Sequence, residues 1–266
     1  MNVATFHKQR EGVTVETRPF LGLPLTRGMG IKDVCALIDP GGDGRFISFI
    51  NPAAWYLIRK CPEYLDALRQ MDFVLPDGQG VAFACRKLTG DFCPRVSFDM
   101  SSLAGPFFEK LESCNKSVIL VGAAPGVAEQ VRTKLALEYP RLKVLKACDG
   151  FGALEEKAAE VMRLRPDAVV VGMGAPRQEQ LLALLKNMSY EGVALTCGGF
   201  FDQYLEASEY YPPLIDRLQL RFAYRVYQEP RRLWRRYLIE YQWFIFAFLR
   251  AALKKIGRIE KDVGTV

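Results

Sequence analysis

The sequence of 266 residues contains a single histidine, His7, which lies in a polar N-terminal stretch. Catalytic triads of the Ser-His-Asp kind need a histidine as general base, and histidine-rich metal sites need several. Both kinds of site are excluded, so acid–base chemistry falls to carboxylates. The seven cysteines form no C-x-x-C pair and mostly lie in apolar runs, which predicts reduced core residues. We therefore expect no metal ion.

Two kinds of hydrophobic segment are also missing. No apolar stretch follows the charged residues at the N-terminus, which argues against a signal peptide and predicts an intracellular protein. The uncharged stretch 241–249 has nine residues, well short of the ~20 that span a bilayer. Half of the residues are nevertheless hydrophobic, which is enough for one substantial core.

Strand and helix patterns alternate along most of the chain. Continuous apolar runs, such as residues 45–50 and 117–122, are separated by segments with helical spacing, the first of which is predicted over 51–71. This order predicts an α/β fold, a Rossmann-like parallel sheet flanked by helices. Its ligands should bind at the carboxyl ends of the strands. We expect residues 1–211 to form this body and 212–266 to form a basic, helical, membrane-binding appendage.

Asp77 and Gly122 both follow a predicted strand. Asp77, in "LPDGQG", is placed to accept a proton from a sugar hydroxyl, although the same residue could instead cap a helix beginning near Val81. Gly122, in "VGAAPG", precedes a helix N-terminus suited to a phosphate, although glycine turns between strand and helix are common.

Two later strand ends carry further polar groups. In "GMGAPRQEQ", Gly174 permits close approach of a ligand, and Arg177, Gln178 and Glu179 gather at a helix start. The alternative is a surface helix start whose acidic residue is favoured by the helix dipole. Asp202, in "CGGFFD", could hold ribose or sugar hydroxyls, or could cap the next helix.

The net charge of +6 is concentrated near the C-terminus. Residues 217–258 contain eleven lysines and arginines against only Glu229 and Glu240. Such a basic segment is expected to bind phosphate groups, whether on nucleic acid, on lipid or on a diphosphate substrate. Guanidinium groups could neutralise a diphosphate leaving group where no metal does so. The alternative is a solvated basic face or a patch for lipid headgroups.

An amphipathic helix is predicted over residues 237–255. Its aromatic face and flanking basic residues are typical of a helix that lies in a membrane interface. The alternative is a helix packed on the protein's own core or on a partner subunit. The expected membrane-contacting residues are Trp243, Phe244, Phe248, Arg250 and Lys254.

Taken in order, several motifs resemble the bacterial WecG/TagA/CpsF glycosyltransferase family (glycosyltransferase family 26), from about residue 20 to 236. The stretches are "INPAAWYLIRK", "DFVLPDGQGVAFACRKLTG", "CPRVSFDM", "VILVGAAPGVAEQ", "PDAVVVGMGAPRQEQ", "CGGFFD" and "YRVYQEPRRLWRR". The resemblance implies an inverting, metal-independent transferase without a cofactor. Its substrates would be a UDP-sugar and a polyprenyl-diphosphate-linked saccharide, at the cytoplasmic face of the inner membrane. No nucleic acid is expected.

The resemblance also implies roles for individual residues. Asp77 falls on the family's proposed catalytic base, and Phe151 on a position suited to stack on uracil. The remaining matches are to substrate-binding positions: Asn51, Gln79, Arg95 and Asp202, together with the arginines thought to close over the diphosphate, Arg225, Arg232 and Arg235.

The chain departs from the family pattern near the expected sugar pocket. Phe49 replaces a frequent threonine, "RVSFDM" replaces R-V/I-T-G-x-D-L, and "EASEYYPP" replaces G-K-x-x-R-A-P. These changes favour transfer of glucose in exopolysaccharide assembly, with N-acetylmannosamine or its uronic acid as the alternative. From other classes, a Rossmann-like NAD-dependent oxidoreductase lacks its glycine fingerprint here, and a non-catalytic membrane or nucleic-acid adaptor would use only the basic tail.

Overall fold

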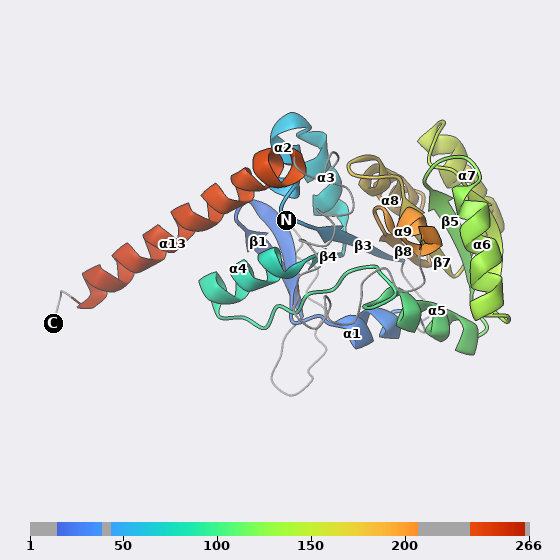
Figure 1. Ribbon diagram of the computed structural model, residues 1–266, viewed down its shortest axis with the longest axis horizontal. Helices are drawn as coiled ribbons and strands as arrows, with labels where there is room; N and C mark the ends of the chain where they lie inside the picture. The colour runs from blue at the N-terminus through green and yellow to red at the C-terminus, as the bar shows by residue number, and fades with distance from the viewer. Residues whose placement is uncertain (1–14, 39–43, 207–234, 264–266) are drawn as a thin grey trace.

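The computed structural model describes residues 15–38, 44–206 and 235–263. Its centre is a six-stranded sheet in the order β4-β3-β8-β7-β5-β6 (Figure 1), and every neighbouring pair of strands is parallel. The strands are β3 (Arg45–Ile50), β4 (Phe73–Pro76), β5 (Ser117–Gly122), β6 (Lys143–Cys148), β7 (Ala168–Gly172) and β8 (Val193–Thr196). The predicted Rossmann-like α/β fold is confirmed.

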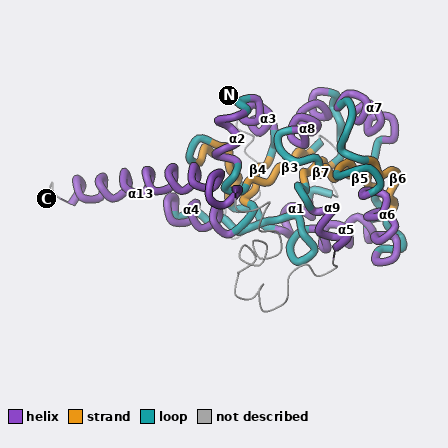
Figure 2. The backbone as a smooth tube through the Cα atoms, turned by 45° about the horizontal axis from the view of Figure 1, so that its top comes forward, coloured by secondary structure: helices purple, strands orange, loops and turns teal. Residues whose placement is uncertain are grey.

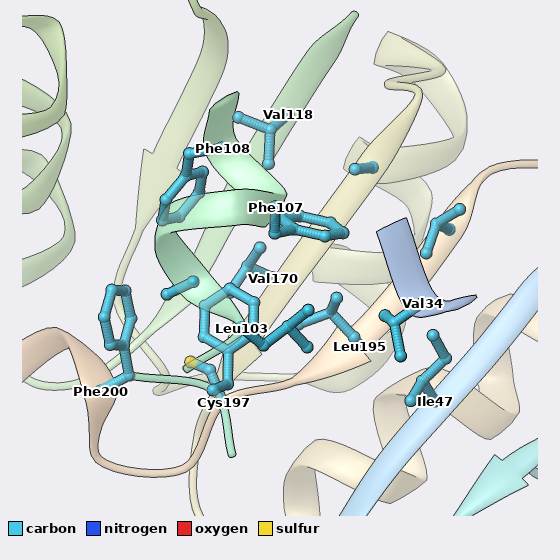
Figure 3. Packing of buried hydrophobic residues seen from close by; sticks show 14 of the residues in the cluster. Val34, Ile47, Leu103, Phe107, Phe108, Val118, Val170, Leu195, Cys197 and Phe200 are labelled. Carbon is cyan, nitrogen blue, oxygen red and sulfur yellow. The ribbon is translucent and has the colours of Figure 1, made fainter. Parts of the chain in front are cut away.

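Helices cover both faces of the sheet. One face carries α1 (Ile31–Ala36), α5 (Ala104–Ser113), α6 (Val127–Glu138) and α9 (Phe200–Glu206). The other carries α2 (Ala54–Lys60), α3 (Glu63–Gln70), α7 (Leu154–Leu164) and α8 (Arg177–Asn187). Alternate residues of each strand contribute to the core layers on opposite faces of the sheet, since successive side chains on a strand point to opposite faces. Val170 and Leu195 therefore meet Phe107 of α5 in one layer (Figure 3), while Val169 and Val171 belong to the other.

The first two strands form a separate antiparallel hairpin, β1 (Glu16–Phe20) and β2 (Leu23–Arg27). The hairpin lies beside β4, where the backbone N–H of Val74 donates to the Thr26 hydroxyl over 2.8 Å. The hairpin therefore lies at the edge of the sheet where β4 ends just before Asp77.

Two elements differ from the predictions. The single helix expected over 51–71 is broken into α2 and α3, because Pro62 keeps Cys61 out of the helical region, at φ −139° and ψ 89°. The helix α5 is not predicted from the sequence at all. Its buried aromatic residues, Phe107 and Phe108, are among the largest side chains that the core encloses.

The chain's last described part is one long helical segment. A π-helical turn, Arg236–Glu240, leads into α13 (Tyr241–Val263), which runs beside α4 (Gln79–Thr89) and then projects away from the body (Figures 1 and 2). None of the described helices is both long and apolar enough to span a bilayer. The predicted boundary between 211 and 212 lies outside the described residues.

Candidate active site

The connections that follow β5 and β7 run in opposite directions across the sheet. The chain passes from β5 to β6 on one side, and from β7 to β8 on the other. In open α/β sheets, ligands bind where the loops after two such strands diverge. A pocket of about 350 Å³ lies at this point, lined by Ala123, Gly150, Phe151, Gly152, Gly172, Met173 and Arg177. We refer to it as the switch pocket.

Another pocket, of about 310 Å³, lies at the opposite edge of the sheet. Arg45, Lys116 and Asp167 are among the residues that line it. None of the site residues predicted from the sequence contributes to it. The carboxyl edge therefore remains the candidate active site.

Two glycines allow the backbones of β5 and β7 to approach each other closely beneath the switch pocket. Gly122 and Gly172 are partners in the β5–β7 register, and the N–H of Ala123 donates to the Gly172 carbonyl over 2.9 Å. A Cβ atom on Gly122 would lie 2.3 Å from that carbonyl oxygen, and one on Gly172 would lie 2.8 Å from the Cys197 sulfur. No larger residue fits at either position without displacing its neighbours. The phosphate contact expected of Gly122 stays a prediction.

Arg177 ties the wall of the switch pocket together. Its guanidinium donates to the carbonyls of Gly150, over 3.3 Å, and Gly152, over 2.9 Å. This joins the start of α8 to the loop that carries Phe151, whose ring is 64% exposed. Gly174 has a φ of 75° in the turn before α8, a conformation that favours glycine. The structure thus brings Gly122, Phe151 and Arg177 close to one another, and their roles in ligand binding stay predictions.

Asp77 lies one residue beyond β4 on a turn that its neighbours fix. Its N–H donates to the Ile50 carbonyl over 2.8 Å, which ties the ends of β3 and β4 together. Gly78 follows with a φ of 84°, and Gln79 begins α4. The half-buried Asp77 carboxylate accepts a hydrogen bond from the Ser97 hydroxyl. The alternative role of Asp77 as a helix cap is wrong, because Gly78 occupies the N-cap and no side chain caps α4.

Ser97 also belongs to the candidate site, although it is not among the residues predicted from the sequence. It stands where the family pattern has threonine, so the hydroxyl that contacts Asp77 is kept. The same loop runs along the end of β4, since the N–H of Val96 donates to the Pro76 carbonyl over 3.0 Å. Arg95, predicted to lie nearby, does so and is ion-paired with Asp99 over 2.8 Å.

Asn51 lies at the end of β3, next to the end of β4. Its side-chain carbonyl accepts a hydrogen bond of 3.0 Å from the Ala53 N–H, which fixes the side chain at the start of α2. Asn51, Asp77 and Gln79 are all half-buried on neighbouring strand ends. The structure therefore brings the predicted base and its two predicted neighbours together.

Two strands separate Asp77 from the switch pocket. Because β3 and β8 lie between β4 and β7, the two groups stand about three strand spacings apart, or roughly 15 Å. A single compact ligand does not reach from one to the other. The arrangement suits an elongated ligand that lies across the carboxyl edge of the sheet.

Between these two places lies a buried polar cluster of Ser48, Gln178, Glu179 and Thr196. Glu179 accepts hydrogen bonds from the Ser48 hydroxyl, over 3.0 Å, and from the Gln178 amide, over 2.9 Å. Glu179 is fully buried and Gln178 nearly so, which corrects the alternative of a surface helix start. Among the described residues, neither the second Glu179 oxygen nor the Gln178 carbonyl has a hydrogen-bond partner. Burial raises the pKa of Glu179 to about 7.

This burial predicts a loss of stability as the pH rises. Glu179 holds its proton more tightly in the folded protein than in the unfolded chain, where its pKa is near 4.5. The contribution of Glu179 to stability is therefore complete below pH 4.5, and roughly 3 kcal/mol of it is lost as the pH rises through about 7. Chemical denaturation across this range should show that decline for the wild type relative to Glu179→Gln, which cannot ionise.

The matched control is Glu156→Gln, at an exposed position on α7. Its difference from the wild type should stay constant with pH. A constant difference for Glu179→Gln as well would contradict the raised pKa. Tyr64 of α3 faces Glu179, and its own pKa is raised well above the ordinary value, first by burial and then by the nearby carboxylate. It therefore stays neutral throughout the range.

The remaining predicted site residues are partly described. Asp202 is exposed in the first turn of α9, after β8, so it neighbours the edge without capping the helix. Arg235 is exposed at the start of the C-terminal helical segment. Arg225 and Arg232 lie outside the described residues. Their predicted roles remain predictions.

The described residues contain no group of three or more His, Cys, Asp or Glu side chains arranged to hold a metal ion.

The predicted membrane helix packs on the protein along one side. Phe244 is only 7% exposed and its ring centroid lies 4.8 Å from that of Trp55, so it is not available to lipid. Phe248 is half-buried against Phe83. Trp243 is more exposed and lies under the Arg59 guanidinium, 3.9 Å from ring centroid to carbon. The inward face of the helix therefore packs on the protein's own core, which was the alternative to membrane contact. The prediction that Phe244 contacts the membrane is wrong.

A Rossmann-like sheet with a pocket at its switch point is the arrangement in which open α/β proteins bind their ligands. The sequence profile described as the glycosyl transferase WecG/TagA/CpsF family matches residues 19–258. The chain belongs to this family. Membership in it argues against the oxidoreductase and adaptor hypotheses.

Similar proteins come from several bacteria. One is the UDP-Gal:alpha-D-GlcNAc-diphosphoundecaprenol beta-1,4-galactosyltransferase of Shigella boydii, 30% identical over 79% of this chain and 88% of that protein. Another is the N-acetylglucosaminyldiphosphoundecaprenol N-acetyl-beta-D-mannosaminyltransferase of Bacillus subtilis, 31% identical over 73% of this chain and 75% of that protein. The enzyme with the same description from Bacillus spizizenii is 27% identical over 73% and 75%.

Proposed function

We propose that this protein transfers a sugar from a UDP-sugar to a polyprenyl-diphosphate-linked saccharide, with inversion at the anomeric carbon. The observation that carries the proposal is the placement of Asp77 and the switch pocket on one edge of the sheet. The Shigella boydii and Bacillus subtilis relatives act on N-acetylglucosaminyl-diphosphoundecaprenol substrates and form beta linkages. Those activities support an acceptor of the same kind here.

In the proposed reaction, Asp77 takes the proton of the acceptor hydroxyl as its oxygen attacks the anomeric carbon. The bond between that carbon and the UDP oxygen breaks, and UDP leaves with the electron pair. The Ser97 hydroxyl orients the carboxylate by donating to it. Arg225, Arg232 and Arg235 neutralise the leaving diphosphate, a role that arginine can take without a metal ion. No covalent enzyme intermediate and no cofactor are required.

We place the nucleotide in the switch pocket. The backbone there is open enough for a phosphate to approach, and the exposed Phe151 ring offers a face on which uracil can stack. The sugar then extends along the carboxyl edge toward Asp77, across Gln178. The Gln178 amide is held by Glu179, so its side chain is preset at this position.

Replacing Phe151 with alanine should weaken UDP binding about tenfold, because stacking of one base on an aromatic ring contributes ~1–3 kcal/mol. Isothermal titration with UDP measures this directly. Phe92→Ala is the control, since Phe92 is also exposed but lies in the loop beside the β1–β2 hairpin. Equal affinity of the Phe151 variant and the wild type would place the base elsewhere.

The donor sugar is proposed to be a neutral hexose, with glucose favoured and N-acetylmannosamine as the alternative. Phe49 replaces a frequent family threonine near the end of β3, two residues before Asn51. A galactosyltransferase among the relatives shows that one homologous protein uses a neutral hexose, while the Bacillus relatives transfer N-acetylmannosamine. A bulky apolar residue in place of a hydroxyl favours a donor with fewer polar substituents at that point.

We further propose that α13 holds the enzyme on the cytoplasmic face of the inner membrane. Its outward side exposes large apolar residues, and Arg250 and Lys254 are exposed beside them. This combination suits a helix lying on anionic lipid. The apolar residues are Ile245, Phe246, Leu249, Leu253 and Ile256.

Substituting glutamate for both Phe246 and Leu253 should abolish co-sedimentation with vesicles of phosphatidylglycerol and phosphatidylethanolamine. The reason is that two carboxylates cannot enter the interface without a large desolvation cost. UDP affinity, measured in the same preparation, should not change. If the double variant still sediments with the vesicles, the membrane surface lies elsewhere on the protein.

A further inference from the structure

The inward face of α13 lies beside the first turn of α4, the helix that follows the turn carrying the proposed base. Phe244 lies against Trp55 of α2 and is 7% exposed. A Cβ atom on Gly80 would lie 3.8 Å from the Phe244 ring and 3.6 Å from the Pro52 side chain. Gly80 is the second residue of α4, three residues after Asp77. The ring therefore packs on the first turn of the helix that begins immediately beyond the catalytic turn.

Other contacts hold α13 in this place along its length. The Arg59 guanidinium of α2 stacks over Trp243, and the Phe248 ring lies 6.5 Å from that of Phe83 on α4. Farther along, the Lys255 ammonium donates to the carbonyls of Lys87, over 3.2 Å, and Leu88, over 3.1 Å. These carbonyls belong to the last turn of α4, where a cation is favoured by the helix dipole. The C-terminal helix thus contacts α4 near both of its ends.

The opposite side of the same turn is fixed by the sheet. The Asp77 N–H is bound to Ile50 of β3, and the Asp77 carboxylate accepts from Ser97. The start of α4 has no side-chain cap, so packing rather than capping must hold it. Phe244 and Trp55 supply that packing. Because protein interiors are close-packed, a displacement of the Phe244 ring should also move the residues that contact it.

From these contacts we propose that Phe244 is a positioning residue for the Asp77–Gly80 turn, so that docking of α13 on α2 and α4 sets the rate of sugar transfer. The inference rests on the proposed function, because it takes Asp77 as the base. It adds a second task to α13, distinct from lipid contact. The inward face aligns the catalytic turn, whatever surface the outward face meets.

The test measures transfer to a diphosphate-linked acceptor sugar with a short, water-soluble alkyl chain, so that no membrane is present. Phe244→Ala should lower kcat about tenfold and leave the KM for the UDP-sugar unchanged, since the switch pocket lies two strands away. Phe244→Leu should restore most of the rate. Leu238→Ala, which truncates a 62% exposed apolar residue of the same helical segment, should leave kcat unchanged.

A second pair of variants probes the contact from α4. Gly80→Ala fits at ordinary contact distance and should keep the wild-type rate, whereas Gly80→Leu places a larger side chain beside the Phe244 ring and should slow transfer as Phe244→Ala does. Unchanged kcat in folded Phe244→Ala and Gly80→Leu would overturn the inference. Equal losses in Phe244→Ala and Leu238→Ala would do so too. Absence of transfer by the wild type would instead count against the proposed function.

Discussion

Replacing Asp77 with asparagine should lower kcat for sugar transfer roughly a thousandfold, the usual scale for loss of a general base. Asparagine has nearly the same shape, and its carbonyl can still accept the Ser97 hydrogen bond. The turn is also held by the backbone bond to Ile50, which the substitution leaves intact. The loss should therefore be chemical rather than structural. Single-turnover measurement of labelled lipid product separates the chemical step from substrate binding.

The control for this variant is Asp66→Asn, at an exposed carboxylate on α3 that pairs only at the surface with Arg69. It should transfer sugar at the wild-type rate. UDP affinity and thermal stability of Asp77→Asn should also equal those of the wild type. Near-normal turnover by Asp77→Asn would show that another group accepts the proton.

Gly122→Ala should destabilise the fold by about 4 kcal/mol, which is exceptional for the addition of one methyl group. The new Cβ atom would stand 2.3 Å from the Gly172 carbonyl oxygen, so the ends of β5 and β7 must separate. Gly122 also has a φ of 153°, which alanine rarely adopts. UDP binding should be lost with the same substitution, because these two strand ends form the floor of the switch pocket. Urea denaturation gives the change in free energy of unfolding.

Gly126→Ala provides the matched control. Gly126 also has a positive φ, of 85°, but a Cβ atom there would meet nothing within 4 Å. Backbone strain alone should cost about 1 kcal/mol. If the two variants lose the same stability, the close approach of the two strands does not determine the effect.

The succession of strands and helices along the chain was predictable because most of the buried strands are continuous apolar runs. Residues 168–172, for example, contain only alanine, valine and glycine, and they form β7. The break at Pro62 also has a local cause, since the residue before a proline avoids the helical region. By contrast, the order of the strands across the sheet depends on which crossovers the helices make, and spacing along the chain does not encode it. The switch point between β5 and β7 therefore emerged only from the structure.

The candidate site was predictable where a residue's chemistry matches its place after a strand. Asp77 and Arg177 follow this rule, and both lie on the carboxyl edge together with Gly122, the last residue of β5. Ser97 was not, because a serine in an irregular loop carries no local signal, and its contact with Asp77 joins residues twenty positions apart. The burial of Glu179 was not predictable either, because its partner Ser48 lies far away in the sequence.

The faces of α13 show the same limit. Helical spacing correctly gives an amphipathic segment, yet it cannot tell an apolar face that meets lipid from one that meets protein. Phe244 is buried because α2 presents Trp55 at the matching place. Phe246, two residues later, is 65% exposed. Only the packing of distant segments distinguishes the two.

The proposed reaction can be measured as transfer from a panel of radiolabelled UDP-sugars to N-acetylglucosaminyl-diphosphoundecaprenol, in buffer containing EDTA. UDP-glucose, UDP-galactose and UDP-N-acetylmannosamine are assayed in parallel, and the product lipids are separated and their anomeric configuration determined. We expect one of these donors to label the lipid through a beta linkage, without added metal. Failure of every donor to label the lipid, by a protein that is folded and binds UDP, would contradict it.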